Sequence, residues 1–113
     1  MNLKQKKLAV VILNWNGKTL LEKFLPSVVR YSDLGKIYVA DNASTDDSVL
    51  FLEENYPNVE IIRNSRNFGY AKGYNEALKN VSEPYLVLLN SDVEVAENWL
   101  NPITEIFENE PQT

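Results

Sequence analysis

Four short apolar runs, separated by longer amphipathic stretches, constrain the fold of this chain more than any other feature of its sequence. The runs are LAVVIL at 8–13, IYVA at 37–40, VEII at 59–62 and YLVLL at 85–89. Continuous runs rich in Val, Ile and Leu are typical of strands that are covered on both faces of a parallel sheet. At 113 residues the chain is long enough for one compact domain and too short for two.

The stretches between these runs carry helical patterns. Apolar residues over 20–29 form one stripe, in which Pro26 is expected to kink or split the helix. Ser44, Thr45 and Asp46 are suitable caps for a second helix. This second helix is expected over 46–56, and two more are expected over 70–80 and 97–108. The last has Trp99, Leu100, Ile103 and Phe107 aligned on one face. Strands that alternate with helices imply right-handed βαβ units, and hence an α/β fold with a mostly parallel sheet flanked by helices.

The chain contains no histidine and no cysteine. Their absence excludes a disulfide framework, thiolate and imidazole metal sites, and nucleophiles activated by histidine. Any metal site must therefore use oxygen ligands, which favour Mg²⁺, Mn²⁺ or Ca²⁺.

Charge is unevenly spread along the chain, whose net charge is −5. Residues 1–36 carry seven Lys/Arg against two Asp/Glu, and residues 37–113 carry four against fourteen. The acidic total argues against a nucleic-acid-binding protein, which usually has a basic face. No apolar run approaches the roughly 20 residues of a membrane helix, so a cytoplasmic location is expected. The basic first third leaves open a peripheral contact with anionic lipid at the cytoplasmic face of a membrane.

An Asn or Asp follows every apolar run: Asn14, Asp41 and Asn90 directly, and Asn64 shortly after the third run. Asn and Asp favour turns and often simply end strands. Ligands of parallel α/β sheets, however, bind outside the carboxyl ends of the strands, where four such ends would converge. Four polar ends out of four, with Asp92 beside the last, favour a ligand site.

Two common phosphate-binding motifs are missing. The first run is followed by NWNGK instead of G-x-G-x-x-G, and the chain has no G-x-x-x-x-G-K-[ST] loop. Three other segments suit a nucleotide. Asp41 and Asn42 could read the hydrogen-bonding edge of a base, and the glycine-bearing turn at 67–73, with Arg66 and Lys72, could accept anionic groups at a helix N-terminus. Asp92 could hold a divalent cation shared with phosphate oxygens, with Asn90 and Glu94 as further oxygen ligands.

Taken together, these segments resemble a known family. VVILNWNG at 10–17, VADNASTDDS at 39–48, NFGYAKGYNEAL at 67–78 and YLVLLNSDVEV at 85–95 resemble the amino-terminal half of family-2 inverting glycosyltransferases with the GT-A fold. Each motif is weak alone, but the four occur in the family's order and spacing. The variant with NWNG, DNAST and LLN-x-D is similar to that of bacterial rhamnosyl- and galactofuranosyl-type transferases.

The resemblance implies a site for a nucleoside diphosphate sugar. Asp41 would bond the base and Asp92, in the position of the family's D-x-D motif, would bind Mg²⁺ or Mn²⁺. The residues implied for nucleotide-sugar binding are Asn14, Asn16, Asp41, Asn42, Arg66, Asn67, Gly69, Lys72, Asn90 and Ser91. The donor is expected to be a dTDP- or UDP-sugar, and the acceptor a saccharide or a lipid-linked molecule.

Three substitutions and the length depart from the family pattern. Asn90 replaces the first acid of D-x-D, Tyr74 stands where the subgroup commonly has Asn, and Asp47 where it often has Gly. The family's general base lies well beyond the segment matched here, so no catalytic residue is expected within the chain. Residues 1–113 are therefore expected to form a single amino-terminal nucleotide-sugar-binding part, with weak binding and little transfer by itself.

Two other classes of protein share the predicted fold. One is a non-catalytic interaction or regulatory module that keeps the fold alone, although such a scaffold needs no acids at the strand ends. The other is a flavodoxin-like or receiver-type domain, which would call for an acidic cluster after the first strand, where this chain has Asn14-Trp15-Asn16.

Overall fold

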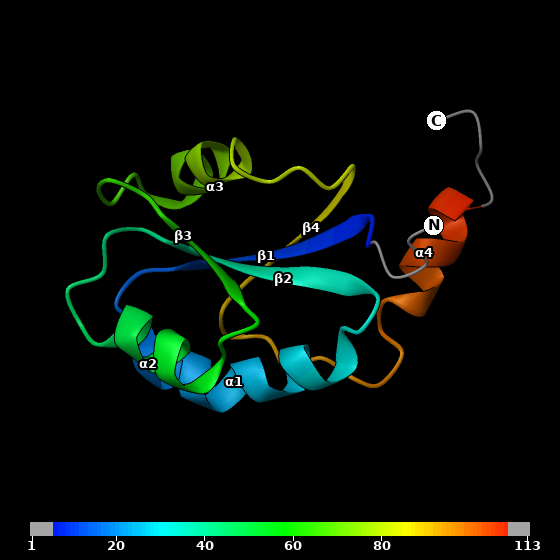
Figure 1. The fold of residues 1–113 in the computed structure, drawn as a ribbon, viewed down its shortest axis with the longest axis horizontal. Helices are drawn as coiled ribbons and strands as arrows, with labels where there is room; N and C mark the ends of the chain where they lie inside the picture. The colour runs from blue at the N-terminus through cyan, green and yellow to red at the C-terminus, as the bar shows by residue number, and fades with distance from the viewer. Residues whose placement is uncertain (1–5, 109–113) are drawn as a thin grey trace.

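The computed structural model describes residues 6–108 as a parallel sheet with helices on both faces (Figure 1). In chain order the elements are β1 (Leu8–Asn14), α1 (Lys18–Tyr31), β2 (Gly35–Asp41), α2 (Ser48–Asn55), β3 (Glu60–Arg63), α3 (Tyr70–Leu78), β4 (Tyr85–Leu89) and α4 (Asn101–Glu108). The four predicted strands and the predicted alternation with helices are confirmed.

The strand order is β3-β2-β1-β4, and every neighbouring pair is parallel. This is the 3-2-1-4 order of Rossmann-like sheets. A flavodoxin-like or receiver-type domain would place β1 between β2 and β3, so that alternative is wrong. The order puts β1 in the middle of the sheet, where all five residues from Leu8 to Ile12 are buried.

Alternate residues of β1 enter two separate cores. Leu8, Val10 and Ile12 belong to a core that also takes in Leu21, Leu25 and Val28 of α1 and Leu52 of α2. Ala9 and Val11 belong to the opposite core, with Tyr74 and Ala77 of α3. Figure 1 shows α1 and α2 below the sheet and α3 above it. Burial on both faces explains why the strands read as continuous apolar runs.

Two local expectations are corrected, and a third lies outside the described residues. α1 runs unbroken through Pro26, so the predicted split is wrong. α4 begins at Asn101 instead of residue 97, because the preceding segment packs against α1 in another conformation. There the Trp99 indole Nε1 donates to Ser32 Oγ at 3.0 Å, and Leu100 is buried. The side chain of Phe107, predicted to lie on the apolar face of this helix, is outside the described residues.

The outer strand β4 is covered on one face only. Tyr85 and Val87 pack on the α1 core, whereas Leu86 and Leu88 face the α3 side and stay 44% and 49% exposed. Within residues 6–108, no helix has the length and apolar character that crossing a bilayer requires.

Candidate functional site

The loops after β1, β2 and β3 leave the sheet toward the left of Figure 1, and β4, which is parallel to β1, ends nearer the middle of the view. Asn14 at the end of β1 lies in register with Asp41 at the end of β2, and Asp41 with Arg63 at the end of β3. β4 is paired to β1 as far as Leu89, opposite Ile12. The sheet therefore brings the predicted site residues after β1, β2 and β4, and those before α3, to one edge.

Asp41 is buried at this edge, with an exposed fraction of 3%. Its carboxylate accepts three hydrogen bonds: from Asn14 Nδ2 at 2.9 Å, from Ser44 Oγ at 2.7 Å and from the Ser44 backbone N–H at 2.9 Å. Burial of a charge requires such partners. A carboxylate has about four acceptor positions, so Asp41 keeps about one for a ligand. Its first task is to hold the loop between β2 and α2.

Ala43 in that loop has a left-handed backbone, with φ at 61°. A residue with a Cβ adopts this conformation at a cost of about 1–2 kcal/mol. The turn lets the Ser44 N–H reach back to Asp41 Oδ2. Nothing in the sequence marked Ala43, because the residue type that tolerates this conformation best is Gly or Asn.

Asn14 presents an unpartnered acceptor at the same edge. Its side chain is 1% exposed, and its Nδ2 donates to Asp41 and, at 3.3 Å, to Ser44 Oγ. Its Oδ1 is buried and has no hydrogen-bond partner. A Cβ on Gly17 would lie 2.5 Å from that oxygen, so only glycine leaves room for it. An unpartnered buried acceptor costs about 1–3 kcal/mol, so this oxygen is an unfavourable feature of the strand end.

Asn16 joins the loop after β1 to the loop after β2. Its Oδ1 accepts the backbone N–H groups of Thr45 at 2.7 Å and Asp46 at 3.1 Å. Its own backbone N–H donates to Ser44 Oγ at 2.8 Å, and its φ of 50° is one that Asn tolerates. Ser44 and Thr45 therefore connect the two loops. The prediction that they cap α2 is wrong. Between Asn14 and Asn16, Trp15 is 54% exposed and offers an aromatic face.

Asp46 does act at the start of α2, with Oδ1 accepting from both the N–H and the hydroxyl of Ser48. Its Oδ2 accepts the Lys18 backbone N–H at 3.2 Å, which is a further link between the two loops. Burial alone would raise the pKa of Asp46, but the hydrogen bonds from Ser48 and Lys18 outweigh it and hold that pKa below its usual value.

Asn42 faces inward and connects β2 to α3. It is 2% exposed, its Nδ2 donates to the Gly69 carbonyl at 2.9 Å, and its Oδ1 accepts from Asn64 Nδ2 at 2.8 Å. Asn64 Nδ2 also donates to the Gly73 carbonyl at 3.1 Å. Both polar atoms of Asn42 are thus committed to the protein. Asn42 therefore lies behind the edge where the strands end, and supports the loop before α3.

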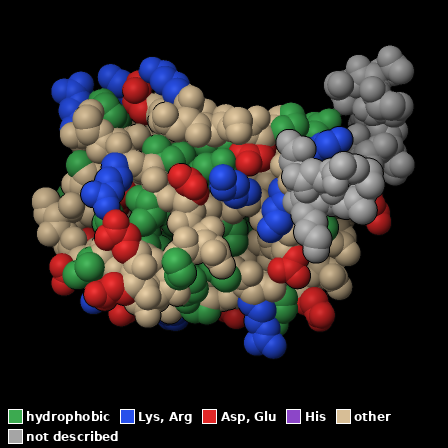
Figure 2. All heavy atoms as spheres, in the orientation of Figure 1, with side chains coloured by type: hydrophobic (Ala, Val, Ile, Leu, Met, Phe, Trp, Pro, Cys, Tyr) green, Lys and Arg blue, Asp and Glu red, His purple; other side chains and the backbone are tan. Residues whose placement is uncertain are grey.

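The loop before α3 concentrates positive charge. Asn67 Oδ1 accepts the Gly69 N–H at 2.9 Å, and Gly69 has a φ of 81°, which glycine adopts without strain. The cationic groups of Arg66 and Lys72 each lie 5.1 Å from the centre of the Phe68 ring. The first turn of α3 contains no acid. Figure 2 shows Lys and Arg side chains gathered at the upper left, over α3 and its preceding loop.

The segment after β4 carries the candidate metal ligand. Asn90 and Asp92 are exposed and Ser91 is half-buried. Asn90 Oδ1 accepts a hydrogen bond from the Tyr70 hydroxyl at 2.9 Å. No cluster of three acidic side chains occurs within residues 6–108. A divalent cation bound by Asp92 would have to take most of its ligands from water and from a bound diphosphate, which is how proteins usually hold Mg²⁺.

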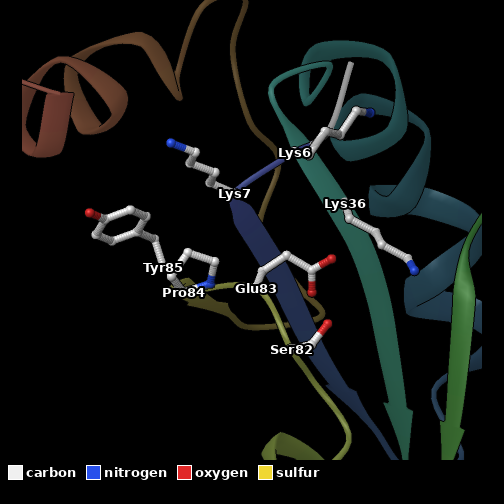
Figure 3. Close-up of a pocket in the computed structure, with 7 residues that line it drawn as sticks. All are labelled: Lys6, Lys7, Lys36, Ser82, Glu83, Pro84 and Tyr85. Carbon is white, nitrogen blue, oxygen red and sulfur yellow. The ribbon is translucent and has the colours of Figure 1, made fainter. Parts of the chain in front are cut away.

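A hollow of about 620 Å³ lies at the opposite end of the sheet, where the strands begin. It is lined by Lys6, Lys7, Lys36, Ser82, Glu83, Pro84 and Tyr85. Figure 3 shows Glu83 between the lysine side chains. None of the candidate residues contributes to it, so this hollow is separate from the site at the carboxyl edge.

Comparison with known proteins places this geometry among glycosyltransferases. The family model described as glycosyl transferase family 2 matches residues 9–113. The teichoic acid poly(glycerol phosphate) polymerase of Staphylococcus epidermidis is 31% identical over an alignment of 109 residues that covers 91% of this chain and 15% of that protein.

Solved structures show the same fold. S. aureus TarS 1-349 in complex with UDP-GlcNAc has a TM-score of 0.78 at 21% identity, over 91% of this chain and 31% of that one. The mannosyltransferase PcManGT from Pyrobaculum calidifontis, in complex with GDP-Man and Mn²⁺, has a TM-score of 0.70 at 22% identity, over 85% of this chain and 30% of that one. This chain thus spans less than a third of the length of each of these proteins.

Proposed function

Because this chain belongs to glycosyl transferase family 2, we propose that it forms the nucleotide-sugar-binding part of a glycosyltransferase. The donor is a nucleoside diphosphate sugar, with UDP or dTDP as the nucleotide, and the acceptor is a saccharide or a lipid-linked molecule. One observation carries the proposal: the base-facing, diphosphate-facing and metal-binding segments of the family pattern meet at one edge of the sheet.

The base binds beside the loops after β1 and β2. Trp15, with its exposed ring, suits stacking against a base, which is worth about 1–3 kcal/mol. The remaining acceptor position of Asp41 suits an N–H donor of the base. Asn16 and Asn42 act behind these residues, by fixing the two loops.

The diphosphate binds between the loop before α3 and the segment after β4. Arg66 and Lys72 supply positive charge, and Asn67 and Gly69 shape a turn that leaves the first N–H groups of α3 available to an anion. On the other side, Ser91 and Asp92 follow β4. Asp92 is the proposed ligand for Mg²⁺ or Mn²⁺. In support, PcManGT, which has a similar fold, was solved in complex with Mn²⁺.

The transfer inverts the anomeric carbon. An acceptor hydroxyl attacks that carbon, the bond from it to the diphosphate oxygen breaks, and the nucleoside diphosphate leaves with the bonding electron pair. A divalent cation, when bound, stabilises the charge of the leaving group. The residues described here bind and orient the donor. The general base that takes the proton of the acceptor hydroxyl lies outside this segment.

The subgroup and the location follow from weaker observations. The NWNG, DNAST and LLN-x-D motifs support a rhamnosyl-type transferase, and the polymerase relative from S. epidermidis supports a role in bacterial cell-surface polymers. The proposed location is the cytoplasm or the cytoplasmic face of a membrane. There the chain would meet nucleotide sugars, and its basic first third could contact anionic lipid.

Calorimetric titration of the chain with UDP, dTDP and GDP, each with and without Mn²⁺, tests the proposal. We expect one of the nucleotides to bind, more tightly with Mn²⁺, and the Mn²⁺ dependence to vanish in Asp92→Ala. Glu97→Ala removes another exposed acid of the same segment and is the matched control. A chain that binds none of the nucleotides would support the non-catalytic module instead. An Asp92→Ala variant with unchanged Mn²⁺ dependence would overturn the metal-binding role of Asp92.

A further inference from the structure

Two tyrosines of α3 reach from the helix to the end of β4. The rings of Tyr70 and Tyr74 pack edge to face, with centroids 5.2 Å apart and planes at 78°. The Tyr74 hydroxyl donates to the Leu89 carbonyl at 3.0 Å and accepts the Leu13 N–H at 3.4 Å. Since Leu89 is in the last paired position of β4 with β1, Tyr74 joins the two strands where their pairing ends.

The Tyr70 hydroxyl extends this connection by one residue. It donates to Asn90 Oδ1 at 2.9 Å, so α3 contacts two consecutive residues, directly before Ser91 and Asp92. Tyr74 is 3% exposed and belongs to the core, whereas Tyr70 is 65% exposed. A hydrogen bond between two exposed side chains contributes little to folding, because water replaces it in the unfolded chain. Its consequence is the orientation of the Asn90 amide.

The orientation decides which atoms of Asn90 a ligand meets. An amide offers one acceptor oxygen and an NH₂ group with two donors. The hydroxyl of Tyr70 takes one of the two acceptor positions of the oxygen, and oxygen is the atom that Mg²⁺ and Mn²⁺ would require. The NH₂ group is left for an acceptor, and a phosphate oxygen is a strong acceptor for such donors. Asn90 in this setting suits a phosphate better than a cation.

We propose that Tyr70 is a positioning residue for the donor diphosphate, holding the Asn90 amide with its N–H groups toward the phosphates while Asp92 alone serves the cation. The inference rests on the proposed function of the site. It divides the two polar positions of the N-x-D segment between two ligands. It also connects the segment after β4 to the loop before α3, because Tyr70 directly follows Gly69, whose carbonyl is held by Asn42.

The test compares Tyr70→Phe with the unchanged protein in calorimetric titrations with UDP and with UMP, in Mn²⁺. Loss of the hydroxyl should raise the Kd for UDP about 3-fold to 10-fold, the range that one net hydrogen bond supports, and leave the Kd for UMP within about 2-fold. Asn90→Ala should show the same selective loss. The double variant should lose no more than either single variant, because both changes remove one interaction. Tyr56→Phe, which removes a hydroxyl at the far end of α2, is the control.

A second measurement needs no nucleotide. In ¹⁵N NMR spectra of the free chain, Tyr70→Phe should shift the Asn90 side-chain NH₂ signals and the backbone signals of residues 91–92, and leave those of residues 14–16 in place. Unchanged Asn90 signals would overturn the positioning role. A protein that binds UDP through Asp92 but shows equal affinities in Tyr70→Phe would overturn this inference alone. A protein that binds no nucleotide would overturn the proposed function, and the NMR comparison would still decide whether Tyr70 orients Asn90.

Discussion

The close approach of α3 to the end of β2 predicts that Gly73→Ala is destabilising, although alanine normally favours a helix. A Cβ at residue 73 would lie 2.6 Å from Asn42 Nδ2, 3.0 Å from Asn42 Oδ1 and 3.1 Å from Leu13 Cδ1. Asn42 has no room to move, since it is 2% exposed and bonded to Gly69 and Asn64. The added methyl group must therefore displace either the amide or the helix.

The opposing contributions can be compared. Alanine in place of glycine stabilises a helix by about 1 kcal/mol. Overpacking of a core contact costs about 1–3 kcal/mol. Displacement of the Asn42 amide would weaken its bonds to the Gly69 carbonyl and from Asn64, at about 1 kcal/mol each. The net result is a loss of about 1–4 kcal/mol in the free energy of unfolding.

Urea unfolding followed by far-UV circular dichroism measures this change. Asn75→Ala, at an exposed position of the same helix, is the matched control and should be neutral or slightly stabilising. In an Asn42→Ala background the obstructing amide is gone, so Gly73→Ala should cost less than it does in the unchanged protein. A stabilising Gly73→Ala, or an equal cost in both backgrounds, would refute the steric argument.

Two further predictions concern pH. The pKa of Asp46 is held below its usual 3.8 in the folded chain, so its contribution to stability is present above pH 3.8 and is lost as the pH falls below that value. Asp46→Asn should therefore flatten the acid side of the stability profile measured by urea unfolding. An unchanged acid slope would count against the Ser48 and Lys18 contacts. Burial, and then the hydrogen bond to Glu83, raise the pKa of the Tyr38 phenol, so its contribution is present below its ordinary value near 10 and is lost as the pH rises above it. Tyr38→Phe should cost about 1 kcal/mol of stability at neutral pH, because it removes the 2.6 Å hydrogen bond to Glu83 Oε1. It should also remove the alkaline loss of stability. A variant that loses stability at alkaline pH as the unchanged protein does would contradict this account.

The pattern of apolar runs was sufficient to predict the sheet. Leu8–Ile12 lies between two helical layers, and an uninterrupted apolar run is what that position requires. The convergence of the polar strand ends followed from the parallel order alone. The glycines of residues 67–73 also predicted a turn before α3, and Gly69 adopts a positive φ there. It did not indicate the start of α4, because the indole of Trp99 meets Ser32, a partner 67 residues away.

The site divides differently between sequence and structure. Residue types and order predicted that Asn14, Asp41, Asn42, Asn90 and Asp92 lie near one ligand. The sequence could not tell which of these side chains turn inward. Asp41 and Asn42 are buried in hydrogen-bond networks, whereas Asn90 and Asp92 are exposed.

That division was decided only by the tertiary structure, because it depends on partners far apart in the chain. Asn42 bonds Gly69, 27 residues later, and Tyr70 bonds Asn90, 20 residues later. The sequence by itself determined where each apolar run ends, and each strand ends within one residue of that point. The packing of α3 against the sheet determined which of those polar groups support the site and which remain available to bind a ligand.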